Sequence, residues 1–230
     1  MSEKVIRQEV SDACKVIANT GLAELFTGHV SRESDNQTIY IPAHLHESGR
    51  GIESIQPKDV IEVGFDGVPT TKTEEEPPDE LIIHSSILDA RDDIHSVAHA
   101  HPLYATALSM AGVQIKPASF DAALLDGGAN IYDPGPRLLY DSNDGEGLVN
   151  ALADNYAVVA RGHGAITAGK SVAEATARMW FLERAARMQV IAEQVGGTQS
   201  FSGTVDSETF LDESPEDFLE ASFEFLRTNY

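Results

Sequence analysis

The spacing of apolar residues along the chain predicts five helices. Within residues 3–19, Val10, Cys14 and Ile17 recur near the helical period, and Gly21 follows as a stop signal. Ser171 and Glu174 match a capping box, which opens the longest of these helices. The predicted helices span residues 3–19, 79–90, 103–110, 171–194 and a last segment that begins at Ser214-Pro215.

Shorter apolar runs, closed by prolines or turns, predict the strands. They span residues 38–41, 60–63, 94–101 and 156–160, whereas residues 127–144 are rich in Gly, Pro and Asp and predict a loop with short strands. Strands and helices alternate, but hairpin-like turns lie among them. We therefore expect a single α/β domain over residues 1–230, with a mainly antiparallel central sheet flanked by helices. An acidic helical extension is expected at about residues 200–230.

Composition excludes several kinds of partner. The chain has 230 residues and a formal net charge of -21, from 37 acidic and 16 basic residues. Binding to nucleic acid or to an anionic membrane is therefore not expected, because both need a basic surface. The acidity suits either a salt-adapted surface or an ordinary acidic protein. No apolar run is long enough to span a membrane, the start lacks a signal-peptide layout, and Cys14 is the only cysteine. These features predict a cytoplasmic protein.

Three histidines stand out as candidate metal ligands. His99 and His101 are two apart in an apolar, strand-like run, so both side chains are expected on one face of a sheet. His163 lies downstream between two glycines, and the fold would have to bring it to the pair. A site with three protein ligands keeps a position open for water or substrate, which is typical of a catalytic metal. The alternative is a pair of polar residues on an exposed strand.

A set of short motifs resembles the class II aldolase and adducin family, which includes the fuculose-phosphate aldolases. The resemblance covers roughly residues 5–195, and it implies a three-layer α/β/α fold. The motifs are Gly28-His29-Val30-Ser31, Glu80, Ala98-His99-Ala100-His101, the run from Ala105 to Ser109, Gly162-His163-Gly164 and the helix from Ser171.

The resemblance also implies a metal site with a nearby base. His99, His101 and His163 would hold a divalent ion, usually Zn²⁺, although neutral imidazoles also suit Mn²⁺, Fe²⁺, Co²⁺ and Ni²⁺. Glu80, nineteen positions before His99, would be the general base and a displaceable fourth ligand. The alternative for Glu80 is a carboxylate that the dipole of its own helix favours. A substrate with adjacent oxygens would chelate the ion, which would stabilise an enediolate while Glu80 moves a proton.

These expectations describe a divalent-metal-dependent carbon–carbon lyase, an aldolase that acts on a small hydroxy-carbonyl compound. Decarboxylation of a hydroxy, oxo or aromatic carboxylic acid generates the same enolate-like species and is the near alternative. An iron-dependent oxygenase and a non-catalytic adducin-like module are further alternatives. A binding module has no need for three such histidines and a carboxylate.

The positions that hold the substrate phosphate in the sugar-phosphate aldolases differ in this chain. Pro78 and Asp79 stand where two serines are typical, and His29 follows Gly28 in place of an asparagine. Proline offers no donor, and a carboxylate repels phosphate. We therefore expect a substrate without the standard phosphate anchor, and Gly28, His29 and Asp79 are its expected contacts.

Two other charged residues are candidates for the site. Arg32 can in principle bind a substrate carboxylate in bidentate fashion, and the alternative is a surface pair with Glu33 or Asp35. Asp121 lies near the region where sugar-phosphate aldolases carry a catalytic tyrosine, so it is a candidate acid–base group; capping of a loop is the alternative.

The remaining histidines are weaker candidates. His95 shares the predicted face of His99, but four residues along a strand is roughly 13 Å, too far to bind the same ion. His84 follows the predicted base by one helical turn and either orients it or has a structural role. His44 and His46 are expected on the surface or in a substrate loop.

The resemblance further implies a homotetramer that acts on a small molecule. Met179, Trp180 and Phe181 on the long helix, together with the C-terminal helix, are candidates for subunit contacts. An apolar stripe on a helix is equally compatible with the subunit's own core.

Overall fold

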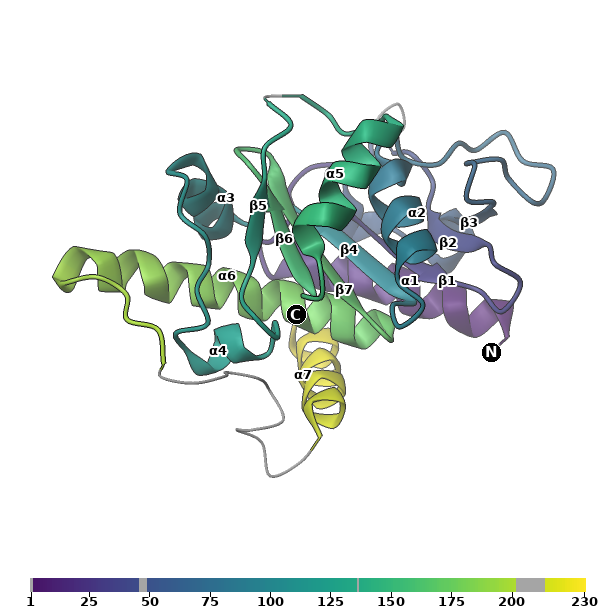
Figure 1. The fold of residues 1–230 in the computed structure, drawn as a ribbon. Coiled ribbons are helices and arrows are strands. Elements are labelled where there is room, and N and C mark those ends of the chain that lie inside the picture. The colour runs from purple at the N-terminus through teal and green to yellow at the C-terminus, as the bar shows by residue number, and fades with distance from the viewer. Residues whose placement is uncertain (1, 46–48, 136, 202–213) are drawn as a thin grey trace.

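The structure is a computed structural model that describes residues 2–45, 49–135, 137–201 and 214–230. A seven-stranded sheet lies at its centre, in the order β3-β2-β1-β4-β7-β6-β5 (Figure 1). Neighbouring strands are antiparallel except β5 and β6, which are parallel. The strands are β1 His29–Glu33, β2 Ile39–Pro42, β3 Val60–Val63, β4 Ser96–Ala100, β5 Asn130–Tyr132, β6 Ala157–Ala160 and β7 Gly164–Gly169.

Helices cover both faces of the sheet, which confirms the predicted α/β architecture (Figure 1). Helices α2 and α5 pack on one face, α1, α3 and α6 on the other, and α7 packs against α6. The helices are α1 Glu3–Asn19, α2 Leu81–Ala90, α3 Leu103–Met110, α4 Phe120–Ala123, α5 Ser142–Leu152, α6 Val172–Val195 and α7 Pro215–Asn229. Short 3-10 turns occur at Ile52–Ser54 and Pro57–Asp59.

Alternation along the strands decides which residues meet on the α2 face of the sheet. In β1 the side chain of Val30 belongs to the core beneath α1 and α6, and in β4 Val97 belongs to the core beneath α2 and α5. Because strand side chains alternate between faces, His29 and His99 lie together on the α2 face, and Arg32 lies on the opposite face. His29 and His99 are also direct partners across the β1–β4 ladder.

The capping box predicted at the start of α6 forms only in part. The hydroxyl of Ser171 accepts the backbone N–H of Glu174 at 3.1 Å, as an N-cap should. The Glu174 carboxylate accepts the backbone N–H of Lys170 instead of that of Ser171, and it pairs with the buried Arg178 at 2.9 Å. The ion pair with Arg178 draws the carboxylate away from the N-cap residue.

Several elements differ from the sequence-based prediction. The predicted strand 94–101 is shorter, because β4 ends at Ala100. The region 127–144, predicted as a loop with short strands, contains the short strand β5 as expected, but it also contains the first turn of α5. Strands β1 and β7 and helices α4 and α5 were not predicted. Residues 202–213 of the predicted C-terminal extension lie outside the described residues, and α7 occupies the part that follows them.

Candidate metal centre

A carboxylate and three imidazoles meet near the end of the central strand β4, beside the turn between β6 and β7. Glu80, His99, His101 and His163 each direct one ligand atom into the cluster, and these atoms all lie within 4.8 Å of one another. Oε2 of Glu80 is 3.5 Å from Nε2 of His99, and its Oε1 is 3.4 Å from Nε2 of His163. Nε2 of His101 is 3.2 Å from Nε2 of His99.

Three separate segments of the chain supply this cluster: the start of α2, the end of β4 and the turn between β6 and β7. Glu80 is the N-cap residue of α2, and its Oε1 accepts the backbone N–H of Leu139 at 3.0 Å. His99 lies in β4, His101 follows the end of that strand, and His163 lies in the turn between β6 and β7.

The tautomer of His99 follows from its backbone contact. Nδ1 of His99 is 3.0 Å from the carbonyl oxygen of Ala165, and a carbonyl can only accept. Nδ1 therefore carries the proton, and Nε2 presents its lone pair to the cluster. Metal-binding histidines commonly have such a partner on the nitrogen that faces away from the ion.

The turn that carries His163 requires glycine on both sides. Gly162 has a φ of +67°, in the left-handed region where side chains are disfavoured. A Cβ on Gly164 would lie 2.5 Å from the carbonyl oxygen of Ala100 and 2.5 Å from Cδ2 of His101. The absence of a side chain at Gly164 thus lets β7 approach β4 closely enough to close the cluster.

Two members of the cluster have shifted pKa values, His101 and Glu80. Burial, and then the neighbouring rings of His99 and His163, lowers the pKa of His101 to about 3. Burial alone would raise the pKa of Glu80, but the rings of His163 and His99 and the N–H of Leu139 outweigh it and lower that pKa. Both nitrogens of His163 are buried without a hydrogen-bond partner among the described residues. A cation among these donors would satisfy them, so the residues present fit a divalent metal ion.

A pocket opens beside the cluster. Its volume is about 290 Å³, and Glu80 and His101 form part of its wall. Phe26, Pro78 and Leu138 supply apolar surface. None of the described residues that line it is a lysine or arginine. The other lining residues are Thr27, Gly28, His29, His44 and Asp79.

Comparison with known proteins agrees with this geometry. Residues 8–190 match the family model described as Class II Aldolase and Adducin N-terminal domain. The chain belongs to the class II aldolase and adducin family. It is 36% identical over 204 residues to a 3,4-dihydroxyphthalate decarboxylase of Terrabacter sp. (strain DBF63), with 84% of each chain covered.

Two further comparisons extend this result. The chain is 31% identical over 201 residues to a 3,4-dihydroxyphthalate decarboxylase of Rhodococcus jostii (strain RHA1), covering 84% of this chain and 82% of that one. The solved structure of L-fuculose 1-phosphate aldolase from Glaciozyma antarctica PI12 superposes with a TM-score of 0.80. At 19% identity, over 98% of this chain and 90% of that one, this likeness shows the shared fold. The relatives support a lyase, and class II aldolases bind a divalent metal.

Three of the residues that were predicted to contact the substrate line the pocket. Gly28, His29 and Asp79 line the same pocket as Glu80 and His101. His44, predicted on the surface or in a substrate loop, lines it too, and His46 lies outside the described residues. The apolar wall and the backbone N–H that holds Glu80 have no signal in the local sequence, so neither was predicted.

Two predicted contacts lie elsewhere. The guanidinium of Arg32 donates to the carbonyl oxygen of Lys170 at 2.8 Å, on the face of the sheet opposite His29. This position does not support the predicted contact between Arg32 and the substrate. The surface pair suggested as its alternative is not formed with Glu33, which contacts His95 at 2.9 Å. Asp121 is buried and pairs with Arg184 at 3.0 Å, and it is absent from the described pocket wall.

His84 takes the structural role that sequence analysis allowed for it. Its Nε2 lies 2.7 Å from Nδ1 of His29, and its Nδ1 lies 2.6 Å from the hydroxyl of Ser31. The ring thus supports His29 rather than Glu80.

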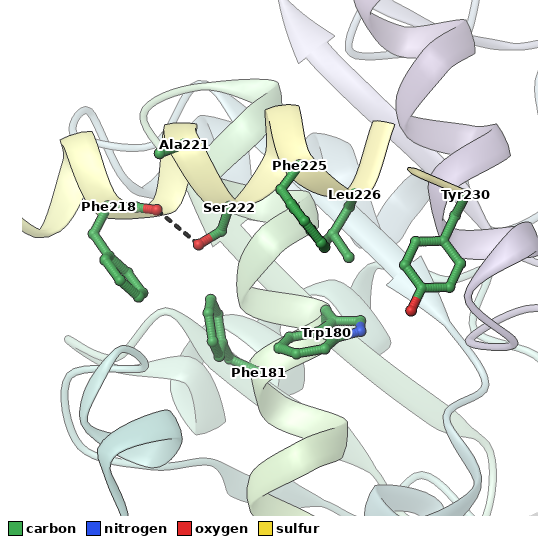
Figure 2. Close-up of a pocket in the computed structure, with 8 residues that line it drawn as sticks. All are labelled: Trp180, Phe181, Phe218, Ala221, Ser222, Phe225, Leu226 and Tyr230. Carbon is green, nitrogen blue, oxygen red and sulfur yellow. Dashed lines mark hydrogen bonds between the residues drawn. The ribbon is translucent and has the colours of Figure 1, made fainter. Parts of the chain in front are cut away.

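A second, apolar cavity of about 330 Å³ lies between α6 and α7, formed by residues that the metal cluster does not use (Figure 2). Trp180 and Phe181 from α6 face Phe218 and Phe225 on α7 and Tyr230, which follows the end of that helix (Figure 2). The hydroxyl of Ser222 is satisfied by the carbonyl of Phe218, so the cavity offers little polar chemistry. We call this surface the α6–α7 groove.

Proposed function

We propose that the protein is a metal-dependent decarboxylase of a dihydroxylated aromatic carboxylic acid, 3,4-dihydroxyphthalate or a close analogue. The observation that carries this proposal is the 36% identity, over most of both chains, to a decarboxylase of that substrate. The proposal favours decarboxylation, the near alternative from sequence, over aldol cleavage.

The pocket wall supports an aromatic substrate over a sugar phosphate. Phe26, Pro78 and Leu138 suit the faces and edge of a flat ring, whereas a phosphate would meet the carboxylate of Asp79. The described wall also lacks the lysine or arginine that commonly binds a phosphate.

In this proposal His99, His101 and His163 hold the metal ion, and Glu80 lies next to it. Three imidazoles and a carboxylate suit Zn²⁺ first, and Fe²⁺, Mn²⁺, Co²⁺ and Ni²⁺ after it. When bound, the divalent ion supplies Lewis-acid stabilisation of negative charge on the substrate oxygens.

Glu80 is the proposed proton carrier. Its neighbours lower its pKa, so Glu80 is ionised at neutral pH and can accept a proton from a substrate hydroxyl that a bound divalent ion would make more acidic. The hydrogen bond from Leu139 fixes one oxygen of Glu80.

The proposed reaction balances as the exchange of a carboxylate for a proton. The bond between the ring carbon and the carboxylate breaks, and carbon dioxide leaves without the bonding electrons. Those electrons stay on the ring carbon, which takes up a proton. Glu80 takes the proton of the hydroxyl, which supplies electron density to the ring, and then delivers that proton to the ring carbon. One proton from water restores the hydroxyl of the product.

The test is an assay of the zinc-reconstituted protein with 3,4-dihydroxyphthalate. We expect equal amounts of carbon dioxide and a dihydroxybenzoate, and no cleavage of L-fuculose 1-phosphate. Glu80→Gln keeps an acceptor for the Leu139 N–H but removes the base, so kcat is expected to fall about 10²–10⁴-fold. Turnover of the sugar phosphate with no release of carbon dioxide would replace the decarboxylase by the aldolase.

We also infer that the enzyme works as a homotetramer in the cytoplasm on a small-molecule substrate. A tetramer is supported by the family, and an intracellular, reducing compartment is supported by a single cysteine, Cys14, that is buried as a free thiol. The described residues include no helix suited to crossing a lipid bilayer.

A further inference from the structure

Helix α3 lies between two of the segments that supply the metal cluster. It begins directly after Pro102, its N-cap residue, which in turn follows His101. The helix packs against β6 and β7, whose connecting turn carries His163, and also against α6. Contacts at the two ends of α3 are therefore able to set where these two histidines lie.

A carboxylate from α6 binds the first N–H groups of α3. Pro102 has no side-chain acceptor for them, and Glu183 supplies one. Its Oε1 accepts the backbone N–H of Tyr104 at 2.9 Å, and its Oε2 accepts that of Ala105 at 3.0 Å. N–H groups in the first turn of a helix have no partner within the helix, and a negative charge there is favourable. Glu183 thus fixes the start of α3 and the backbone that follows His101.

The hydroxyl of Ser109 joins the other end of α3 to the turn that carries His163. It accepts the backbone N–H of Gly162 at 3.0 Å and donates to the carbonyl oxygen of Thr106 at 2.6 Å. Both directions are fixed, because a backbone N–H only donates and a carbonyl only accepts. Ser109 is 1% exposed, so water has little access to replace these partners.

The ring of His163 depends on its backbone for its position. A backbone carbonyl contacts the ring of His99, and a backbone N–H holds the carboxylate of Glu80. Neither ring nitrogen of His163 has a hydrogen-bond partner among the described residues. The turn that carries His163, and the bond from its Gly162 N–H to α3, therefore determine where this ring lies.

We propose that Ser109 and Glu183 are positioning residues of the metal site, which hold the two ends of α3 and so set the separation of His101 and His163 before the ion binds. The inference rests on the metal site of the proposed function and not on its substrate or its reaction. Neither residue belongs to the metal cluster, so the loss of either removes no ligand. A site arranged in advance binds more tightly, because less ordering accompanies binding.

The test measures Zn²⁺ affinity and does not depend on turnover. Transfer of Zn²⁺ from the loaded protein to a chelating indicator gives the Kd, and the visible spectrum of the Co²⁺-loaded protein reports the geometry of the ligands. Ser109→Ala removes the acceptor of the Gly162 N–H and should raise the Kd about tenfold and change the Co²⁺ spectrum. Glu183→Ala should do the same from the other end of α3. Glu183→Gln keeps one carbonyl acceptor and should lie between Glu183→Ala and wild type.

Two control variants separate positioning from a general loss of stability. Ser11 is fully buried in α1, and its hydroxyl donates to a backbone carbonyl one turn earlier at 2.9 Å, as that of Ser109 does. Glu193 lies on α6, like Glu183, and accepts a backbone N–H from beyond the end of that helix at 3.2 Å. Ser11→Ala and Glu193→Ala should keep the wild-type Kd and Co²⁺ spectrum even where Tm falls.

The outcomes distinguish this inference from the proposed reaction. Wild-type Kd and Co²⁺ spectrum in folded Ser109→Ala overturn the role of Ser109, and the same result in folded Glu183→Ala overturns that of Glu183. An equal loss of affinity in Ser11→Ala overturns the inference, because the effect is then one of stability alone.

A misfolded variant is recognised from its Tm. If Ser109→Ala does not fold, the two Glu183 variants decide by the same measurements. Weakened Zn²⁺ binding in the Ser109 and Glu183 variants, in a protein that releases no carbon dioxide from 3,4-dihydroxyphthalate, upholds the positioning role and overturns the decarboxylase. A wild type that binds neither Zn²⁺ nor Co²⁺ overturns the inference.

Discussion

At the scale of single residues, the environment of His163 points to a missing partner for its ring. Both of its ring nitrogens are buried without hydrogen-bond partners, and leaving a buried polar group unpaired costs about 1–3 kcal/mol. The nearest carboxylate oxygen, from Glu80, stands 3.4 Å away. A divalent ion shared by these groups would offset the cost, so metal binding and folding stability are expected to be coupled at this site.

Removal of one ligand should therefore abolish metal retention. Purified wild type is expected to contain close to one equivalent of a divalent metal by elemental analysis. His101→Ala should lower the affinity at least about 100-fold and emerge from purification nearly metal-free. His95→Ala is the matched control, because His95 is near the same strand but pairs with Glu33. Equal metal content in wild type and His101→Ala would contradict the three-histidine site, as would no metal in either protein after incubation with zinc, iron and manganese.

The residues of the site could be predicted from sequence only in part. Whether a strand residue reaches the site depends on which face of the sheet its side chain occupies. His99 was readable as part of a strand, and its pairing with His101 follows from spacing. His29 and Arg32 are three apart, so a strand sends them to opposite faces. Because strand β1 was not predicted, the opposite orientation of these two side chains could not be inferred. Arg32 was therefore predicted to contact the substrate, like His29. The pairing of Asp121 with Arg184 joins two helices far apart in sequence, which no local pattern reveals.

At the scale of elements, the segment before α5 positions the proposed base. Asp144, in the first turn of α5, is fully buried and accepts from both terminal nitrogens of Arg137 at 2.6 Å. It also accepts the backbone N–H of Tyr140 and of Asp141. Between these anchors lies Leu139, the donor to Glu80. The helix thus determines where the Leu139 N–H points.

Asp144→Asn should damage both stability and the site. It leaves Arg137 without its bidentate partner, so we expect Tm to fall by about 5 °C and kcat to fall as the donor to Glu80 becomes less well held. Glu146→Gln, on the exposed side of the same helix, is the control and should leave both unchanged. Calorimetry and the decarboxylation assay measure the two effects; a variant with wild-type values for both would show that Asp144 does not brace this segment.

The sign of the pH dependence follows from the same contacts. Burial raises the pKa of Asp144, but Arg137 and the N–H groups of Asp141 and Tyr140 outweigh it and hold the pKa below the ordinary 3.8. The carboxylate therefore stabilises the folded state above about pH 4, and this contribution is lost as the pH falls toward the folded pKa. The difference in Tm between wild type and Asp144→Asn should shrink on acidification in that range.

The elements that sequence analysis missed share a physical cause. Strand β7 consists mainly of Gly and Ala, which have low strand propensity, and it forms because β4 and β6 pair with it on both sides. Helix α5 contains Gly145, where a Cβ would lie 2.0 Å from the hydroxyl of Ser86 in α2. Close packing selected glycine there against its helix propensity. The long α6, by contrast, was predictable from its cap and its stop signal.

At the scale of the whole molecule, an acidic chain presents a concentrated apolar surface at one edge. The formal net charge is -21, yet Phe225 and Tyr230 are 62% and 57% exposed beside Trp180 in the α6–α7 groove (Figure 2). Mutual repulsion between acidic copies opposes association. Exposed aromatic side chains gathered on one surface favour it, because an interface removes them from water.

We expect these aromatic residues to be subunit contacts, and Phe225→Glu tests this at the groove. Burying a phenylalanine contributes about 1.5–3 kcal/mol, and symmetry repeats the loss in every subunit, so a buried carboxylate there should dissociate the assembly.

Light scattering at micromolar concentration should give four copies of the 24.8-kDa chain for wild type and a smaller species for Phe225→Glu. Val195→Glu, on an 82% exposed residue at the end of α6, adds the same charge outside the groove and should keep the wild-type mass. A wild type of 24.8 kDa would overturn the tetramer. An unchanged mass in folded Phe225→Glu would show that the interface lies outside the groove, because a glutamate that is tolerated at that position is still in contact with water.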